Sequence, residues 1–157
     1  MTTRTDIDDF LALRRFAMVG VSRDAKDFSR GLFRDLCACG YDIVPVNLFA
    51  EEVDDHEAFQ CVQVIRPAVE GAWLMTSPQT TEQVVRDCAE AGIRHVWMYG
   101  AGGQGAVSEE AVQFCRNSDI RVVEGYCPHM FLPGTAFPHR VHGFLMKLVG
   151  RYPRKAV

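Results

Sequence analysis

Short apolar runs alternate along this chain with segments of helical periodicity. The runs occupy residues 15–22, 41–47, 71–77, 95–99 and 120–124. None of them alternates polar with apolar residues, which is typical of strands buried on both faces. Strands that alternate with helices through short connections predict an α/β fold, a Rossmann-like, doubly wound and mainly parallel sheet.

A short edge strand is also expected at residues 61–64, so we predict the strand order 3-2-1-4-5-6, counted along the chain. Helices are expected near residues 7–13, from Ser29 to Gly40, from Ser77 to Gly92 and from Ser108 onward. Serine accepts from orphan N–H groups at helix starts, and glycine ends helices readily. Trp73 and Trp97 fall in predicted strands and are expected in the core.

The chain of 157 residues is expected to form one domain, residues 1–157, with a core over about residues 7–131. The extension at about residues 132–157 has Val141, Phe144, Leu145 and Leu148 at helical spacing, which predicts an amphipathic helix. This helix has two expected positions, either against its own domain or against a second copy of the chain in a homodimer.

Charge and hydropathy narrow the range of partners. A formal net charge of −3 gives no bulk attraction to nucleic acid, so we expect none as a partner. No apolar run approaches the roughly 20 residues of a membrane span, and the N-terminus lacks a signal-peptide layout. We therefore expect a cytoplasmic protein without a membrane partner, whose six cysteines are mostly reduced core residues.

A glycine pattern follows the strand predicted at residues 95–99. Gly100, Gly102 and Gly105 spell G-x-G-x-x-G, and Glu124 follows about twenty residues later, as in dinucleotide-binding folds. That fingerprint belongs after the first strand, whereas this one comes late in the chain. The Gly100–Gly105 loop is therefore a close-packed turn or lid, a contact for the far end of a ligand, or the site of an NAD(P)-dependent oxidoreductase.

The loop after the first strand, residues 20–31, is the better candidate for binding phosphate. It has three cations, Arg23, Lys26 and Arg30, and two hydroxyls, Ser22 and Ser29. The helix expected from its end would direct backbone N–H groups toward the same space. The alternative is a solvated turn with scattered charge.

The end of the second strand favours a nucleotide with more phosphate than NAD. NAD sites usually place an acidic residue there, whereas this chain has Asn47. An amide does not repel an additional ribose phosphate.

Residues 16–47, FAMVGVSRDAKDFSRGLFRDLCACGYDIVPVN, together with Thr76-Ser77-Pro78, the AGI at 91–93 and Cys127-Pro128, resemble the small CoA-binding domain proteins. These proteins are related to the CoA-binding domain of the succinyl-CoA synthetase alpha subunit. The resemblance covers roughly residues 7–131 and implies a Rossmann-like sheet that holds coenzyme A. It implies a phosphate side lined by Gly20, Val21, Ser22, Arg23 and Lys26, an adenosine flanked by Pro45, Val46 and Asn47, and a pyrophosphate and pantetheine bordered by Thr76, Ser77 and Pro78.

We therefore expect a non-catalytic binding or sensor module for coenzyme A or an acyl-CoA, with no catalytic residues. Cys127 follows the last strand, at the edge where the crevice opens, and is expected near the CoA thiol, with which it could form a mixed disulfide. The alternative is that Cys127 is a small apolar residue packed under the Cys-Pro turn. Cys127, His129, His139 and His142 do not have the spacing of a common zinc site, so no metal is expected.

Overall fold

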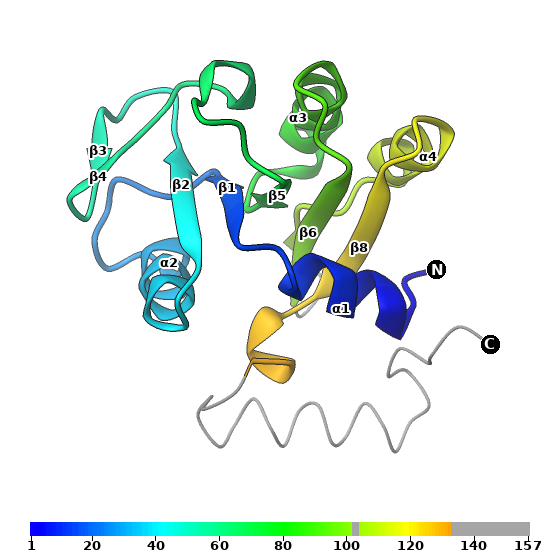
Figure 1. Ribbon diagram of the computed structural model, residues 1–157, viewed down its shortest axis with the longest axis horizontal. Helices are drawn as coiled ribbons and strands as arrows, with labels where there is room; N and C mark the ends of the chain where they lie inside the picture. Colours follow the sequence, from blue (N-terminus) through cyan, green and yellow to red (C-terminus); the bar gives the residue numbers. More distant parts are fainter. Residues whose placement is uncertain (102–103, 133–157) are drawn as a thin grey trace.

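The computed structural model describes residues 1–101 and 104–132 and has a central sheet with helices on both faces (Figure 1). Its parallel strands are β1 (Arg15–Val19), β2 (Asp42–Val46), β5 (Gly71–Leu74), β6 (His95–Ala101) and β8 (Arg121–Tyr126). They lie in the order β2-β1-β5-β6-β8, and every neighbouring pair is parallel. The prediction of a Rossmann-like, mainly parallel α/β sheet is therefore confirmed.

The four α-helices of the described residues form one layer on each side of the sheet. α1 (Arg4–Leu11) and α2 (Phe28–Ala38) cover one face, and α3 (Pro78–Glu90) and α4 (Glu109–Asn117) cover the other (Figure 1). Ser77 and Ser108 cap α3 and α4 as predicted. The other two helices begin slightly earlier than the sequence suggested, because Thr3 forms a capping box with Asp6 and Asp27 caps α2.

The prediction of a short edge strand at residues 61–64 is wrong. Val62–Val64 form the 3-10 helix η1, in which Val62 is buried and Val64 is exposed. Val62 and Ile65 are both buried and lie three residues apart, a spacing that suits a helical turn and not a strand. The outer side of β2 has instead a single parallel bridge between Val46 and Phe59. A small hairpin of β3 (Glu52–Val53) and β4 (His56–Glu57) precedes that bridge.

Each face of the sheet has its own apolar core. The face under α1 and α2 is aromatic: Trp73 and Trp97 are fully buried, as predicted, and stack with ring centroids 4.5 Å apart. Phe10 of α1 packs edge-on against both indoles. The face under α3 and α4 is mainly aliphatic and includes Cys88 and Cys115.

The cysteine prediction holds for half of the six residues. Cys88, Cys115 and Cys127 are buried, Cys37 and Cys61 are half-buried, and Cys39 is exposed. None of these cysteines is in a disulfide. The predicted C-terminal amphipathic helix lies outside the described residues, and no helix within them is long and apolar enough to cross a membrane.

Candidate ligand-binding crevice at the carboxyl edge of the sheet

A pocket of about 390 Å³ opens at the carboxyl ends of β1, β2 and β5. The chain leaves β1 toward α2 on one face and leaves β5 toward α3 on the other, so strand order reverses here. Such switch points are where ligands bind in open α/β sheets. The pocket is lined by Val19, Gly20, Val46, Asn47, Leu48, Phe49, Gln60, Cys61, Val62, Thr76, Thr80, Gln83, Val84 and Asp87.

Gly20 starts the first loop with a backbone conformation that favours glycine. Its φ is +90°, and a Cβ added there would lie 3.0 Å from the carbonyl oxygen of Met75. A side chain would therefore be strained and would also collide with the backbone after β5. The absence of a side chain lets the two strand ends approach each other beside the pocket.

The two serines of the first loop are used to fold it. The backbone N–H of Ser22 donates to Ser29 Oγ at 2.9 Å, and Ser29 Oγ donates to Asp27 Oδ1 at 2.5 Å. Ser22 Oγ accepts from the backbone N–H of Asp24 at 3.1 Å. Ser29 is buried, so the structure gives this residue a role in the shape of the loop.

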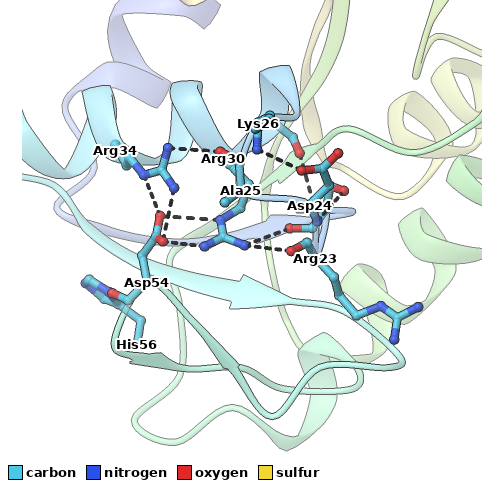
Figure 2. A network of polar contacts seen from close by, with 10 residues as sticks. Arg23, Asp24, Ala25, Lys26, Arg30, Arg34, Asp54 and His56 are labelled. Atoms are coloured by element: carbon cyan, nitrogen blue, oxygen red, sulfur yellow. Dashed lines mark hydrogen bonds and ion pairs between the residues drawn. The ribbon is translucent and has the colours of Figure 1, made fainter.

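Arg30 holds the same loop from below, through the network in Figure 2. Its side chain is 8% exposed, and Nη1 donates to the carbonyl oxygens of Ser22 and Arg23 at 3.2 Å each. Its remaining donors bind the carboxylate of Asp54, in the turn between β3 and β4. Arg34 donates to the same carboxylate at 2.7 Å and to the carbonyl oxygen of Ala25 at 3.1 Å. Hydrogen bonds from the two arginines lower the pKa of Asp54 to about 2.

Arg23 and Lys26 are the cations of this loop that point to solvent. Both residues are exposed, and Figure 2 shows the Arg23 side chain directed away from the Asp54 network. Within residues 1–101 and 104–132, neither has a carboxylate within 4.0 Å of its charged nitrogens. The Arg23 guanidinium lies 5.9 Å from the ring centroid of Phe49, at the mouth of the pocket. These two charges are therefore available to an anion.

Asn47 joins the loops after β1 and β2. Its Nδ2 donates to the carbonyl oxygen of Val21 at 2.7 Å, and its Oδ1 accepts from the backbone N–H of Phe49 at 2.8 Å. Val46 and Asn47 line the pocket, whereas Pro45 is buried in β2 and its carbonyl accepts from the N–H of Phe59. The second loop thus borders the pocket through Asn47 and its two apolar successors in the chain.

The segment after β5 forms the third side. Thr76 lines the pocket, and its Oγ1 lies 2.7 Å from Thr81 Oγ1. Ser77 accepts from the backbone N–H of Thr80, and Pro78 occupies the first turn of α3. The pocket therefore extends along α3, from Thr80 to Asp87.

The described residues of the Gly100–Gly105 segment belong to two antiparallel strands, a β-hairpin. Gly100 of β6 pairs with Gly105 of β7 (Gln104–Gly105), and α4 starts only after Ser108. A Cβ on Gly100 would lie 2.6 Å from the Cα of Gly125, and one on Gly105 would lie 2.3 Å from the carbonyl oxygen of Tyr99. These two glycines permit close backbone packing, whereas a dinucleotide fingerprint opens directly into a helix. Gly102 lies outside the described residues.

Glu124, the acidic partner in that pattern, is already paired. Its carboxylate accepts from Arg116 at 2.8 Å and lies 3.4 Å from the N-terminal amine. In a dinucleotide site this carboxylate would accept hydrogen bonds from ribose hydroxyls, whereas Glu124 is bound to two cations of its own chain.

Cys127 lies apart from the pocket lining, on the side of the carboxyl edge that α2 covers. Its Sγ is 3.9 Å from Nδ1 of His129, and Nε2 of His129 is 3.0 Å from the carboxylate of Asp35 in α2. No local pattern could have assigned Asp35 to this histidine, because the two residues are 94 positions apart.

Several other neighbours of the crevice were also missed. Arg34 and Asp54 contact each other only through the tertiary fold, so nothing in the sequence around either residue could have indicated the pair. The exposed apolar pair Leu48 and Phe49, directly after Asn47, is a pattern that could have been recognised.

Comparisons with known proteins agree with this architecture. The family described as "CoA binding domain" matches residues 14–133. The alpha subunit of an ADP-forming acetate–CoA ligase II from Pyrococcus furiosus is 27% identical over 128 residues, which cover 77% of this chain. The match covers 28% of that relative, so this chain spans about a quarter of its length.

Solved structures share the fold. A hypothetical protein from Pyrococcus horikoshii is 25% identical, with a TM-score of 0.74, and the match covers 80% of this chain and 87% of that one. An acetyl-coenzyme A synthetase from Ca. Korarchaeum cryptofilum is 23% identical, with a TM-score of 0.63 over 71% of this chain and 26% of that one.

Proposed function

Because this chain belongs to the CoA-binding domain family, we propose that it binds coenzyme A or an acyl-CoA as a non-catalytic binding or sensor module. The observation that supports this proposal best is the position of the pocket. It lies at the switch point of the sheet, beside a loop with two cations that have no carboxylate partner among the described residues. That arrangement suits a ligand with a nucleotide at one end and several phosphates next to it.

The proposal assigns the phosphates to the first loop. Arg23 and Lys26 supply positive charge beside the pocket, on a chain whose formal net charge is −3. Gly20, Val21 and Ser22 supply the backbone beside them. Ser29 and Arg30 shape the loop from beneath, because their polar groups are already bound to Asp27, Asp54 and loop carbonyls.

The adenosine is assigned to the second loop and the connecting phosphates to the third. Val46 and Asn47 border the pocket, with Pro45 behind them, and Phe49 offers an aromatic face beside Arg23. Thr76, Ser77 and Pro78 lie at the positive end of the α3 dipole, which favours an anion. Cys127 lies further along the carboxyl edge, where the thiol end of CoA is proposed to reach.

Calorimetric titration with CoA, dephospho-CoA, NAD and NADP tests this function. We expect CoA to bind tightest and dephospho-CoA to bind more weakly, because it lacks the ribose phosphate that Asn47 tolerates and nearby cations attract. Comparable affinity for an acyl-CoA would extend the ligand class. Binding of NAD or NADP more tightly than CoA would instead support an oxidoreductase that uses the Gly100–Gly105 hairpin.

A further inference from the structure

Cys127, His129 and Asp35 form a chain of polar contacts that the proposed binding function does not require. Cys127 follows β8, His129 lies in the 3-10 helix η2 (Pro128–Met130), and Asp35 lies in α2. Cys127 and His129 are buried, whereas the Asp35 side chain is 62% exposed. A thiol, an imidazole and a carboxylate in this sequence can activate a nucleophile, because the carboxylate orients the ring and the ring accepts the thiol proton.

The contact with Asp35 determines which nitrogen of His129 faces the thiol as an acceptor. A carboxylate accepts hydrogen bonds, so the Nε2 that lies 3.0 Å from Asp35 is the nitrogen with the proton. In the neutral ring, the lone pair is then on Nδ1, which lies 3.9 Å from Cys127 Sγ. When Nδ1 takes up a proton, the ring becomes a cation that Asp35 stabilises.

The thiol needs such a base. Burial raises the pKa of Cys127, although a hydrogen bond from the backbone N–H of His129 lowers it. The resting group is therefore a thiol near neutral pH, and the thiolate forms by transfer of its proton to His129. The same backbone N–H then stabilises the negative sulfur.

This cluster lies next to the start of α2, where the first loop ends. Phe28 is the first residue of α2, and its ring centroid lies 5.4 Å from Tyr99 and 6.5 Å from His129. Asp35 belongs to the same helix. The end of β8 lies three strand spacings from the end of β1, a distance of roughly 14 Å at about 4.8 Å per spacing. A thiol arm of about that length, anchored on the first loop, can reach Cys127.

We propose that Cys127, with His129 as base and Asp35 as positioning residue, reacts with a CoA disulfide to form a mixed disulfide with CoA. This inference rests on the proposed function, because the bound nucleotide is what brings the sulfur to Cys127. Disulfide exchange suits the site, since attack on sulfur creates no oxyanion that would need further donors.

The step is balanced in atoms and electrons. His129 Nδ1 takes the proton of Cys127, and the thiolate attacks one sulfur of the CoA disulfide. The Sγ–S bond forms as the S–S bond of the disulfide breaks. The second CoA leaves as a thiolate and takes the proton from His129. Cys127 is oxidised, the departing CoA is reduced, and the products are the mixed disulfide and one free CoA.

The test is the rate and location of adduct formation. Reduced protein is incubated with CoA disulfide or with glutathione disulfide, and adducts are followed by intact mass and located by peptide mapping. We expect CoA on Cys127 and faster reaction with CoA disulfide than with glutathione disulfide. Modification of Cys61 in the pocket or of exposed Cys39 in place of Cys127 would overturn the proposal, and so would equal rates for the two disulfides.

Variants separate the roles. Cys127→Ser should abolish the adduct, and Cys39→Ser, the control, should leave its rate unchanged. His129→Gln should slow the reaction by about 10²-fold at neutral pH. The rate of adduct formation by His129→Gln should then depend on pH only through ionisation of the Cys127 thiol. Asp35→Asn should slow the reaction less and should shift the pH profile of the rate. If His129→Gln formed the adduct at the wild-type rate and had the melting temperature of the wild type, His129 would not be the base.

A binding measurement distinguishes the two proposals. Calorimetry measures how the wild type binds reduced CoA, a step that involves no disulfide exchange. If the wild type binds reduced CoA but forms no adduct with CoA disulfide, the thiol proposal fails and the binding function stands. If the wild type does not bind reduced CoA, the binding function itself fails.

Discussion

At the scale of single residues, the cations beside the crevice are of two kinds: those that hold the first loop, and those that have no carboxylate partner in the part of the chain that the structure describes. Arg30 and Arg34 share Asp54, whereas Arg23 and Lys26 extend from the loop that these pairs hold. A phosphate bound as proposed would therefore meet charges that have no carboxylate partner within residues 1–101 and 104–132. This division makes separate predictions for the two kinds of cation.

The double variant Arg23→Ala/Lys26→Ala should bind CoA about 10²-fold more weakly. Charge-assisted hydrogen bonds contribute roughly 1.5–3 kcal/mol each, less where solvent screens them. Calorimetry should also show that added salt weakens CoA binding to the wild type more than to this variant. The matched control is Arg14→Ala/Arg94→Ala, which removes two exposed charges just before β1 and β6, at the opposite edge of the sheet. Equal losses in both variants would mean that net charge, and not this loop, attracts the ligand.

Asp54→Asn should lower the free energy of unfolding by about 2 kcal/mol at neutral pH, because it leaves the buried Arg30 guanidinium without a counter-charge. The folded pKa of Asp54, about 2, lies below the ordinary value of 3.8. Its ionisation therefore stabilises the fold fully above pH 4 or so, and this contribution is lost as the pH falls toward about 2.

Urea titrations from about pH 6 to about pH 3 check this prediction. The difference in unfolding free energy between wild type and Asp54→Asn should shrink as the pH falls. Asp55→Asn is the control, since Asp55 occupies the same turn, also with a positive φ of 62°, and is exposed. A difference that does not depend on pH would contradict the assignment of the stabilisation to the Asp54 charge.

At the scale of elements, α2 connects the parts of the site. Its N-terminus receives the first loop, its first two turns supply Arg30 and Arg34, which bind the β3–β4 turn, and Asp35 on the same helix contacts His129. One helix thus fixes the phosphate loop, the small hairpin and the end of β8 relative to one another. A shift of α2 would therefore change the positions of the first loop, the β3–β4 hairpin and the end of β8.

The β6–β7 hairpin is an element whose glycines are needed for packing. Gly100→Ala should destabilise the protein by about 1–3 kcal/mol, because the new Cβ would lie 2.6 Å from the backbone of Gly125. Gly31→Ala is the matched control: Gly31 lies in α2 and a Cβ there meets nothing within 4 Å. That change should stabilise the fold by about 0.5–1 kcal/mol through helix propensity. Denaturant titration measures both, and a neutral Gly100→Ala would refute the packing role.

At the scale of the whole molecule, the aromatic core ties the N-terminal helix to the sheet. Phe10 of α1 lies 5.1 Å from Phe16 and within 6 Å of both stacked tryptophans, measured between ring centroids. These residues come from α1, β1, β5 and β6, so the cluster joins four elements across the face opposite the pocket.

Phe10→Ala should lower the free energy of unfolding by about 3–5 kcal/mol, because it leaves a cavity against two rigid indoles. Phe49→Ala should change stability by less than about 0.5 kcal/mol, since that ring is 76% exposed. Urea denaturation followed by tryptophan fluorescence compares them. If Phe10→Ala proved as mild as Phe49→Ala, α1 would not be an integral part of the core.

Much of this fold follows from local patterns. The five apolar runs became the five parallel strands, and Ser77 and Ser108 became helix caps, because burial on both faces and capping both act within a few residues. The two tryptophans were placed in the core for the same reason. The family resemblance at residues 16–47 likewise rests on an order of residues along the chain.

Other features were decided by contacts between distant segments. Residues 61–64 have the composition of a strand, yet they turn into η1 so that Val62 and Ile65 are both buried. The G-x-G-x-x-G spacing occurs in a hairpin, since Gly125 of the neighbouring strand occupies the space that a side chain at Gly100 would need.

The sequence by itself determined the layered α/β architecture and the loop that offers cations at its carboxyl edge, because periodicity and charge are properties of neighbours in the chain. Only the tertiary structure decided how those groups are used. Asp54 reaches Arg30 across 24 residues, and Asp35 reaches His129 across 94. Which charge is bound and which is free, and which thiol faces a base, depend on distances that form only when the sheet and its helices pack together.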